Sequence, residues 1–325
     1  MNLQLLLVII FSCFASPSRS ERCNPKDKKV LLQIKKDNDN PYHLASWDPN
    51  TDHCYWYVIK CDRKTNRINA LTVFQANISG QIPAFVGDLP YDLETLEFHH
   101  VTNLTITIPP AIAKLTNLKM LRLSFTNLTG PIPEFLSQLK NLTLLELNYC
   151  QFTHTIPYSL SQLPNLLLDR NKLTGTIPES FGRFKGPNIP DFWLYLSHNS
   201  LTGHVFASLG DLHFSTLFFS RNKTEVEFLF GKNKTSQTID LSCRLLEFDI
   251  SKSEFAELLT SLDLNHNLIF GSLPPGLKDV HMQFFNVSYN RLCGQIPRGG
   301  TLQSFDQYSY LHNKLLCGSP LPKCK

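Results

Sequence analysis

The stretches LDLNHNLIFGSLP (residues 262–274) and FNVSYNRLCGQIP (residues 285–297) decide the fold, because both follow one pattern, LxLxxNxLxGxIP. Further copies occupy 122–133, 145–157, 167–178 and 194–206, and weaker copies fill the gaps between them. The position held by Asn in the pattern recurs ten times, at a mean spacing of about 24 residues. The ten residues are Ala76, Val101, Thr126, Cys150, Asn171, Asn199, Asn222, Arg244, Asn267 and Asn290. Such a period indicates a solenoid in which each repeat forms one coil.

The repeat also predicts the local structure of a coil. Successive side chains of a strand point to opposite faces, so the leucines of LxL point inward and the residues between them point outward. The Asn position turns inward and bonds the backbone of neighbouring coils. Thr126 and Cys150 can make only part of the hydrogen bonds that Asn makes at this position. Arg244 does not fit there, so we expect a local distortion of its coil. The proline of GxIP, with its fixed φ, begins the return segment.

This pattern resembles the leucine-rich repeat. The resemblance implies an α/β solenoid, a curved right-handed superhelix of about ten coils with disulfide-bearing N- and C-terminal caps. We expect a signal peptide at 1–20, an N-terminal cap at 21–66, the repeats at 67–297 and a C-terminal cap at 298–325. The interval from Cys150 to Asn171 is 21 residues and the next, to Asn199, is 28, so we expect the register of the exposed strand face to shift there.

Composition and charge exclude several classes of protein. The chain of 325 residues is 42% hydrophobic with a net charge of +4, which is too mild for a nucleic-acid binder. Residues 1–20 carry a short apolar run typical of a secretory signal. No later stretch has about 18 uninterrupted apolar residues, so we expect no membrane span and an exported protein.

The sequence gives no sign of catalysis, cofactor or metal. It has no phosphate-binding loop and no Gly-x-Ser-x-Gly motif. Adjacent strand residues point to opposite faces, so His99 and His100 are not expected to chelate together. Eight cysteines follow the signal and cluster near the two ends, which favours disulfides over zinc because no Cys-x-x-Cys pair occurs.

Four stretches resemble plant polygalacturonase-inhibiting proteins: CNPKDKKVLLQIKK (23–36), SW (46–47), NVSYNRLCGQIPRGGTLQSFD (286–306) and CGSPLPKCK (317–325). The resemblance covers essentially the whole mature chain. It implies a cell-wall protein of plant defence that binds fungal endopolygalacturonases and has no catalysis of its own. The same fold family includes a carrot-type antifreeze protein and the ectodomains of receptor-like proteins.

The cysteines depart from this family. Its members carry a cysteine pair where this chain has His53-Cys54, and a cysteine at the position of Leu315. The resemblance therefore implies the disulfides Cys54–Cys61 and Cys317–Cys324. It leaves Cys23 and Cys293 without partners, and we expect them to be free or paired between molecules.

The outward strand positions predict a binding surface on the concave face, since solenoids use this face for partners. Aromatic side chains among both charge signs are typical of a protein interface. We expect four acids of this surface (Glu146, Asp169, Asp240, Asp263) to meet basic residues of the pectinase, and the aromatic residues to supply most of the affinity. Pectin is a further possible partner, through scattered lysines. The expected contact residues are Glu97, His99, Arg122, Phe125, Glu146, Tyr149, Asp169, Arg170, Tyr195, His198, Arg221, Asp240, Asp263, His266 and Tyr289.

Two other functions stay open. A row of hydroxyls three residues after the Asn position (Ser79, Thr129, Thr153, Thr174 and Thr202) suits ice binding, although such hydroxyls often bond the backbone. A receptor-like role is the other alternative, against which the missing membrane segment argues.

Seven N-x-S/T sequons test the coil register. Asn222 holds an inward position and is expected to carry no glycan, and Asn286 lies on the concave face. Glycans are expected on Asn77, Asn103, Asn127, Asn141 and Asn233.

Overall fold

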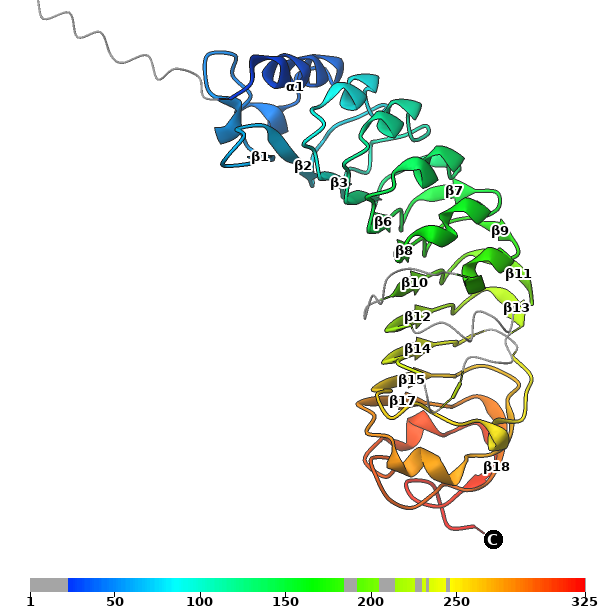
Figure 1. Ribbon diagram of the computed structural model, residues 1–325. Helices are drawn as coiled ribbons and strands as arrows, with labels where there is room; N and C mark the ends of the chain where they lie inside the picture. Colours follow the sequence, from blue (N-terminus) through cyan, green and yellow to red (C-terminus); the bar gives the residue numbers. More distant parts are fainter. Residues whose placement is uncertain are drawn as a thin grey trace, which may run out of the picture.

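The computed structural model describes residues 23–183, 192–204, 214–225, 230–231, 234–243 and 246–324. The expected signal peptide, the sequon at Asn233 and the distortion expected at Arg244 lie outside the described residues. The described chain forms one long curved solenoid (Figure 1). No helix among these residues is long and apolar enough to cross a membrane.

The N-terminal cap is built around the helix α1 (Pro25–Asp37). The side chain of Asn24 accepts a hydrogen bond from Lys26 N (2.9 Å), and Pro25 begins the helix with a φ that suits it. Buried Asp27 accepts two hydrogen bonds from the Arg67 guanidinium, at 2.8 and 2.9 Å, and so joins the helix to the first coil. The indole rings of Trp47 and Trp56 stack beside it and cover the end of the core.

An eleven-stranded sheet lines the inner side of the curve (Figure 1). Its first strand is antiparallel and belongs to the cap, while the ten strands that follow are parallel, one per coil, as the repeat predicts. The predicted fold class is therefore confirmed. In sheet order the strands are β1 (Ile59–Cys61), β2 (Ile68–Phe74), β3 (Thr95–His99), β4 (Met120–Ser124), β6 (Leu144–Glu146), β8 (Asn165–Leu167), β10 (Trp193–Tyr195), β12 (Thr216–Phe218), β14 (Thr238–Asp240), β15 (Ser261–Asp263) and β17 (Phe284–Asn286).

Shorter strands and 3-10 turns form the remaining sides of the coils. The small sheets are β5 (Thr129–Pro131) with β7 (Gln151–Thr153), β9 (Thr174–Gly175) with β11 (Ser200–His204) and β13 (Lys223–Glu225), and β16 (Phe270–Ser272) with β18 (Asn290–Gln295) and β19 (Asn313–Cys317). Most 3-10 turns of the repeats begin directly after the proline of GxIP, as predicted. The turns are η1 (Tyr42–Leu44), η2 (His53–Tyr55), η3 (Ala84–Asp88), η4 (Pro110–Lys114), η5 (Glu134–Gln138), η6 (Tyr158–Gln162), η7 (Glu179–Arg183), η9 (Ile250–Lys252), η10 (Pro275–Asp279) and η11 (Gln307–Ser309).

The inward asparagines hold adjacent coils together. Asn171 Nδ2 donates to Leu147 O of the preceding coil (2.8 Å) and to Leu168 O of its own (3.0 Å), and its Oδ1 accepts from Phe152 N. The same set of bonds recurs at Asn199, Asn222, Asn267, Asn290 and Asn313. The inward position of Asn222 is thus confirmed. Asn313 is the sixth of these asparagines and holds an eleventh repeat position, which the sequence pattern missed because it lies in the expected C-terminal cap.

The unequal coil lengths do not disturb the sheet. Leu145 pairs with Leu166, and Leu166 with Leu194, so the inward leucines of β6, β8 and β10 stay aligned. The expected register shift is therefore wrong, because the concave strands continue in register across both unequal intervals. At the Asn position of the earlier coils, Thr126 Oγ1 and Cys150 Sγ lie 3.1 Å apart and bond each other.

Candidate binding surface

The outward residues of the concave sheet form straight columns, because the parallel strands pair residue for residue. One column contains Thr72, Glu97, Arg122, Glu146, Leu167, Tyr195, Phe218, Asp240, Asp263 and Asn286. Six of the expected contact residues lie in it. Leu167 and Phe218 were missed, since apolar residues beside the LxL motif are not distinguished from the core by pattern alone.

A second column stands directly before the Asn position, and its residues all have a positive φ, between 49° and 61°. Non-glycine residues seldom adopt this left-handed conformation. From Gln75 to Tyr289, each backbone N–H of the column donates to the next coil, as Tyr149 N does to Asp169 O (3.0 Å) and His198 N to Ser220 O (2.9 Å). We call this column the left-handed ladder; it consists of Gln75, His100, Phe125, Tyr149, Arg170, His198, Arg221, Cys243, His266, Tyr289 and His312.

The regular conformation brings the ladder's side chains face to face. The rings of His100 and Phe125 stack with centroids 4.1 Å apart, and those of Phe125 and Tyr149 at 4.0 Å. The Arg170 guanidinium lies 4.9 Å from the centre of the Tyr149 ring. A second stack joins His266, Tyr289 and His312, each step 4.0 Å. The sequence missed His100 and His312 as members, since the left-handed turn cannot be read from strand alternation.

The two neighbouring histidines correct one expectation. The rings of His99 and His100 lie 4.5 Å apart, on the same side of the sheet. The prediction that they point to opposite faces is wrong, because His100 leaves the strand conformation with a φ of 55°. Burial, together with the charges of His100 and Arg122, lowers the pKa of His99.

Arg122 sits between two carboxylates on the concave face. Its Nε donates to Glu146 Oε2 (2.7 Å) and one terminal nitrogen donates to Glu97 Oε1 (3.2 Å). Ser124 Oγ donates to the other oxygen of Glu146 (3.0 Å) and therefore accepts from His99 Nδ1 (2.6 Å). Glu146, which we expected to meet basic residues of an enzyme, is buried, and both of its oxygens are bound within this chain.

The other three acids expected at the interface, Asp169, Asp240 and Asp263, differ in their surroundings. Oδ1 of Asp169 is buried without a hydrogen-bond partner, and burial raises the pKa of this carboxyl to about 6. Burial also raises the pKa of Asp263, which pairs in register with Asp240. Asp240 and Asp263 thus form a half-buried acidic pair near the C-terminal end of the sheet.

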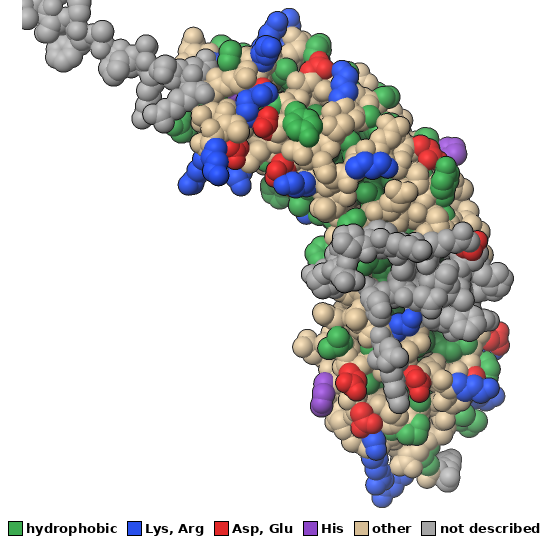
Figure 2. Space-filling view, in the orientation of Figure 1, with side chains coloured by type: hydrophobic (Ala, Val, Ile, Leu, Met, Phe, Trp, Pro, Cys, Tyr) green, Lys and Arg blue, Asp and Glu red, His purple; other side chains and the backbone are tan. Residues whose placement is uncertain are grey.

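Exposure decides which side chains a partner can reach. Tyr149 is 39% exposed and Tyr289 45%, and Arg170, Arg221 and His266 are exposed as well. At the start of each strand a further outward column adds Trp193 and Phe284, both exposed and both missed by the sequence. Across the face drawn in Figure 2 the charged side chains of both signs are interspersed, with no extended patch of one sign.

The sequons differ in accessibility. Asn77, Asn103, Asn127 and Asn141 are exposed, and Asn103 Nδ2 donates to Asn77 Oδ1 on the adjacent coil (2.9 Å). Asn222 is buried with its amide fully bonded, and Asn286 is half-buried on the concave sheet.

The cysteines correct the expectation for Cys23. Its sulfur lies beside that of Cys54, which also pairs with Cys61, so Cys23 is not isolated at the end of the molecule. At the other end Cys317 pairs with Cys324, and Cys293 is free and faces Leu315 on β19. Cys150 and Cys243 are also free.

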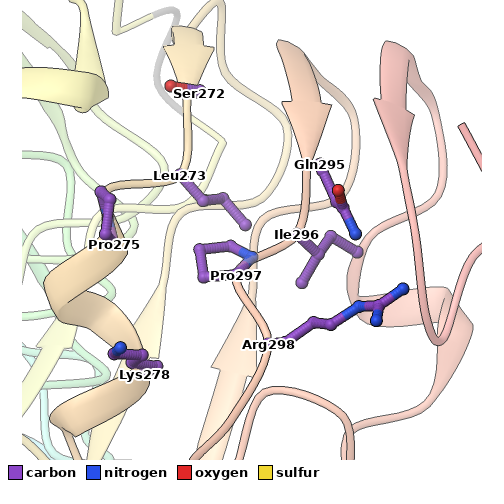
Figure 3. A pocket seen from close by; sticks show the side chains of 8 residues that line it. All are labelled: Ser272, Leu273, Pro275, Lys278, Gln295, Ile296, Pro297 and Arg298. Carbon is purple, nitrogen blue, oxygen red and sulfur yellow. The ribbon is translucent and has the colours of Figure 1, made fainter.

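Two features lie away from the concave sheet. Among the described residues, the one cluster suited to a metal is Cys23, His53, Cys54 and Cys61 in the N-terminal cap. Near the C-terminal end an open depression of about 650 Å³ has Lys278 and Arg298 as its charged lining (Figure 3). Its other lining residues are Ser272, Leu273, Pro275, Gln295, Ile296 and Pro297.

Comparisons with known proteins agree with this architecture. A family model described as "Leucine rich repeat N-terminal domain" matches residues 24–62, and one described as "Leucine Rich Repeat" matches 117–139, 141–163, 164–184 and 258–280. The chain is 60% identical to a polygalacturonase inhibitor of Pyrus communis over 326 residues, which cover 99% of this chain and 98% of that protein. This chain belongs to the polygalacturonase-inhibitor family.

A second family member, the polygalacturonase inhibitor of Vitis vinifera, is 57% identical to this chain over a region that covers 98% of this chain and 96% of that protein. Membership of the polygalacturonase-inhibitor family makes this chain a leucine-rich repeat protein without enzymatic activity. Among solved structures, a plant ice-binding protein superposes with a TM-score of 0.89 and 47% identity, over 94% of this chain and 99% of that one.

Proposed function

We propose that this protein is a secreted cell-wall protein of plant defence that binds and inhibits fungal endopolygalacturonases through its concave face. The observation that carries the proposal is the stacked left-handed ladder, whose aromatic rings are fixed in place and partly exposed beside Arg170. Rigid aromatic side chains next to an arginine are the residue types that dominate protein interfaces. The full-length similarity to polygalacturonase inhibitors supports the choice of partner.

Because Glu146 is buried, we assign the contact with basic groups of the enzyme to other acids of the concave face. Asp240 and Asp263 are the pair available to basic groups of the enzyme, since Glu146 is bound to Arg122. Their role is to orient the partner, while the aromatic residues of the ladder supply affinity.

The test is the release of reducing ends from polygalacturonate by several fungal endopolygalacturonases, with and without the purified protein. Circular dichroism establishes beforehand that the sample is folded. Inhibition of one enzyme supports the proposal. A folded sample that inhibits none of them, at concentrations where the Pyrus communis inhibitor is active, contradicts it.

Ice binding is the second candidate, favoured by the similarity to a plant ice-binding protein. The row of hydroxyls supports ice binding less strongly, because three of them form hydrogen bonds within the protein. Thr129 Oγ1 donates to Gln151 O (3.2 Å), Thr202 Oγ1 to Gly175 O (3.4 Å), and Thr153 Oγ1 bonds its neighbour His154. Hydroxyls engaged with the protein are less available to order water. A measurement of thermal hysteresis separates this function from inhibition.

Pectin is proposed as a further ligand of the depression in Figure 3, because Lys278 and Arg298 suit the carboxylates of polygalacturonate. Co-sedimentation with pectin is expected to weaken in the variant Lys278→Glu/Arg298→Glu and to stay unchanged in Lys114→Glu, an exposed control in η4. Equal co-sedimentation of all three contradicts the assignment.

A further inference from the structure

The outward column of the concave sheet is apolar in its middle. Leu167, Tyr195 and Phe218 hold three successive places in it, between Glu146 on one side and Asp240 on the other. The rings of Tyr195 and Phe218 pack with their centroids 4.6 Å apart. All three residues are half-buried, so part of each stays open to the concave side. Three adjacent coils therefore present a continuous run of apolar surface.

Trp193 widens this surface toward the beginning of the strands. It lies two residues before Tyr195 on β10, so both side chains point to the concave side. Its partners in register are Asn165 and Thr216, and it is 37% exposed. Contiguous apolar side chains with a polar border are typical of an interaction site, whereas single exposed ones are common on any protein. We call this set the apolar strip; it consists of Leu167, Trp193, Tyr195 and Phe218.

Positive charge borders the apolar strip on the side of the left-handed ladder. Arg170 and Arg221 stand on either side of His198 in the ladder, and both are exposed. Burial lowers the pKa of His198, and the charges of the two arginines lower it further, against the opposite effect of Asp240. Within the part of the chain that the structure describes, neither guanidinium forms an ion pair, not even Arg170 with its neighbour Asp169. Their charges are therefore available to a partner.

Short side chains separate the apolar strip from the ladder. On β12 and the residues that follow it, the order across the concave face is Phe218, Ser220, Arg221. Ser220 is buried, and its Oγ donates to the Oγ of Ser197 in the preceding coil (3.0 Å), which is buried as well. No large side chain thus stands between the aromatic ring and the guanidinium, and one ligand group can touch both.

We propose that the centre of the concave face binds a segment of a partner protein that presents an apolar side chain next to a carboxylate. The apolar side chain packs on the apolar strip, and the carboxylate lies between Arg170 and Arg221, because a guanidinium binds a carboxylate with charge-assisted hydrogen bonds. An enzyme with a basic residue at this place is rejected, since it would meet two cations.

This inference rests on the proposed function, in which the partner is an endopolygalacturonase, and it adds the chemistry of the surface that the enzyme presents. The acidic group of the enzyme faces the two arginines, and its basic groups face Asp240 and Asp263 farther along the sheet. Opposite charges at two separate places allow only one orientation of the enzyme on the concave face.

The first measurement uses a small probe of the same chemistry, anilinonaphthalene sulfonate, whose aromatic rings carry a negative charge. We expect saturable binding with energy transfer from Trp193 that Trp193→Phe removes, because the other two tryptophans, Trp47 and Trp56, are buried in the N-terminal cap. The variant Arg170→Glu/Arg221→Glu is expected to bind the probe about fivefold more weakly or worse.

A matched control makes the same change of charge elsewhere. Lys114 lies in η4 and Lys140 shortly after η5, and both are exposed and away from the concave sheet. Lys114→Glu/Lys140→Glu is expected to bind the probe as the wild type does. Circular dichroism establishes that each variant is folded, and Arg170→Gln/Arg221→Gln gives the same comparison if the glutamate variant does not fold.

The second measurement is the dissociation constant of the complex with a susceptible endopolygalacturonase, by titration calorimetry. Trp193→Ala and Arg170→Glu/Arg221→Glu are each expected to raise it about tenfold or more, because central anchors of an interface dominate its affinity. Lys114→Glu/Lys140→Glu is expected to leave it unchanged.

Two results overturn the inference. One is probe binding that is equal in the wild type, Trp193→Ala and Arg170→Glu/Arg221→Glu. The other is an enzyme complex that both variants form with the dissociation constant of the wild type. A wild type that binds the probe at the apolar strip, with loss in the variants, but binds no endopolygalacturonase refutes the proposed function and supports the chemistry assigned to this site.

Discussion

The rings of Phe125 and Tyr149 stack across two neighbouring coils, with centroids 4.0 Å apart and planes inclined by 13°. Both residues have a φ of 53°, so the backbone itself fixes the two rings in parallel. A side chain held in this way loses little conformational entropy when a partner docks on it.

Tyr149→Ala is therefore expected to weaken inhibition of a susceptible endopolygalacturonase by about tenfold or more, which corresponds to roughly 1.4 kcal/mol. The inhibition constant from the reducing-end assay measures it. Tyr158→Ala, an exposed tyrosine of η6 away from the concave sheet, serves as the control and is expected to change nothing. Equal inhibition by both variants would remove the ladder from the interface.

Glu146 is expected to matter for stability. Glu146→Ala leaves Arg122 with Glu97 alone and is expected to lower the free energy of unfolding by about 2–3 kcal/mol, since the pair is largely removed from water. Glu94→Ala breaks an exposed pair with Lys119 of similar length and is expected to cost about 0–1 kcal/mol. Urea denaturation compares the two, and a Glu146 effect no larger than that of Glu94 contradicts the prediction.

The raised pKa of the Asp169 carboxyl predicts that the stability of the folded protein depends on pH. Its folded-state pKa is raised from 3.8 to about 6 by burial, so the folded protein holds this proton more tightly than the unfolded chain. The free energy of unfolding therefore falls as the pH rises from about 4 to about 6 and is level above that. Asp169→Asn is expected to be more stable than the wild type by about 3 kcal/mol at neutral pH, a difference that shrinks as the pH falls from about 6 to about 4. Parallel pH profiles of the two proteins would show that the carboxyl does not titrate differently on folding.

Cys293 and Leu315 are register partners on β18 and β19, and Cys293 is free. Leu315→Cys is expected to form a disulfide that raises the free energy of unfolding by about 2–4 kcal/mol. Leu315→Ser is the control for the loss of the exposed leucine. Thiol labelling of the denatured, unreduced protein should find one thiol fewer in Leu315→Cys than in the wild type. If the two proteins label equally, the register of the C-terminal strands differs from the one described.

The repeat predicts which residues point outward on most of the concave face, but it does not predict the contacts that these residues make with one another. Strand alternation placed Glu97, Arg122 and Tyr195 on the concave face, because the LxL pair fixes which residues point outward. It failed at His99 and His100, where a left-handed residue ends the strand and turns both rings to one side. It also gave no means of telling that Glu146 is covered by Arg122 of the preceding coil, since that contact joins residues a whole repeat apart.

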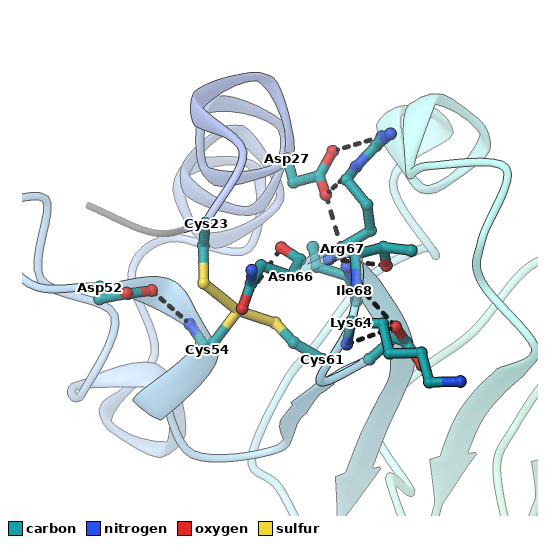
Figure 4. The surroundings of a disulfide bond; sticks show 11 residues. Cys23, Asp27, Asp52, Cys54, Cys61, Lys64, Asn66, Arg67 and Ile68 are labelled. Carbon is teal, nitrogen blue, oxygen red and sulfur yellow. Dashed lines mark hydrogen bonds and ion pairs between the residues drawn. A yellow bond between two sulfur atoms is a disulfide. The ribbon is translucent and has the colours of Figure 1, made fainter. Parts of the chain in front are cut away.

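By itself the sequence determined the solenoid, the ten concave strands and the asparagines that join the coils. These features depend on the local spacing of residues within one repeat, and every repeat folds into the same kind of coil. Only the tertiary structure decided which outward side chains stay available and which bind each other, because those contacts form between coils. The same holds for the cap (Figure 4), where Cys23, His53, Cys54 and Cys61 come from three separate segments and meet only when the helix packs on the first coil.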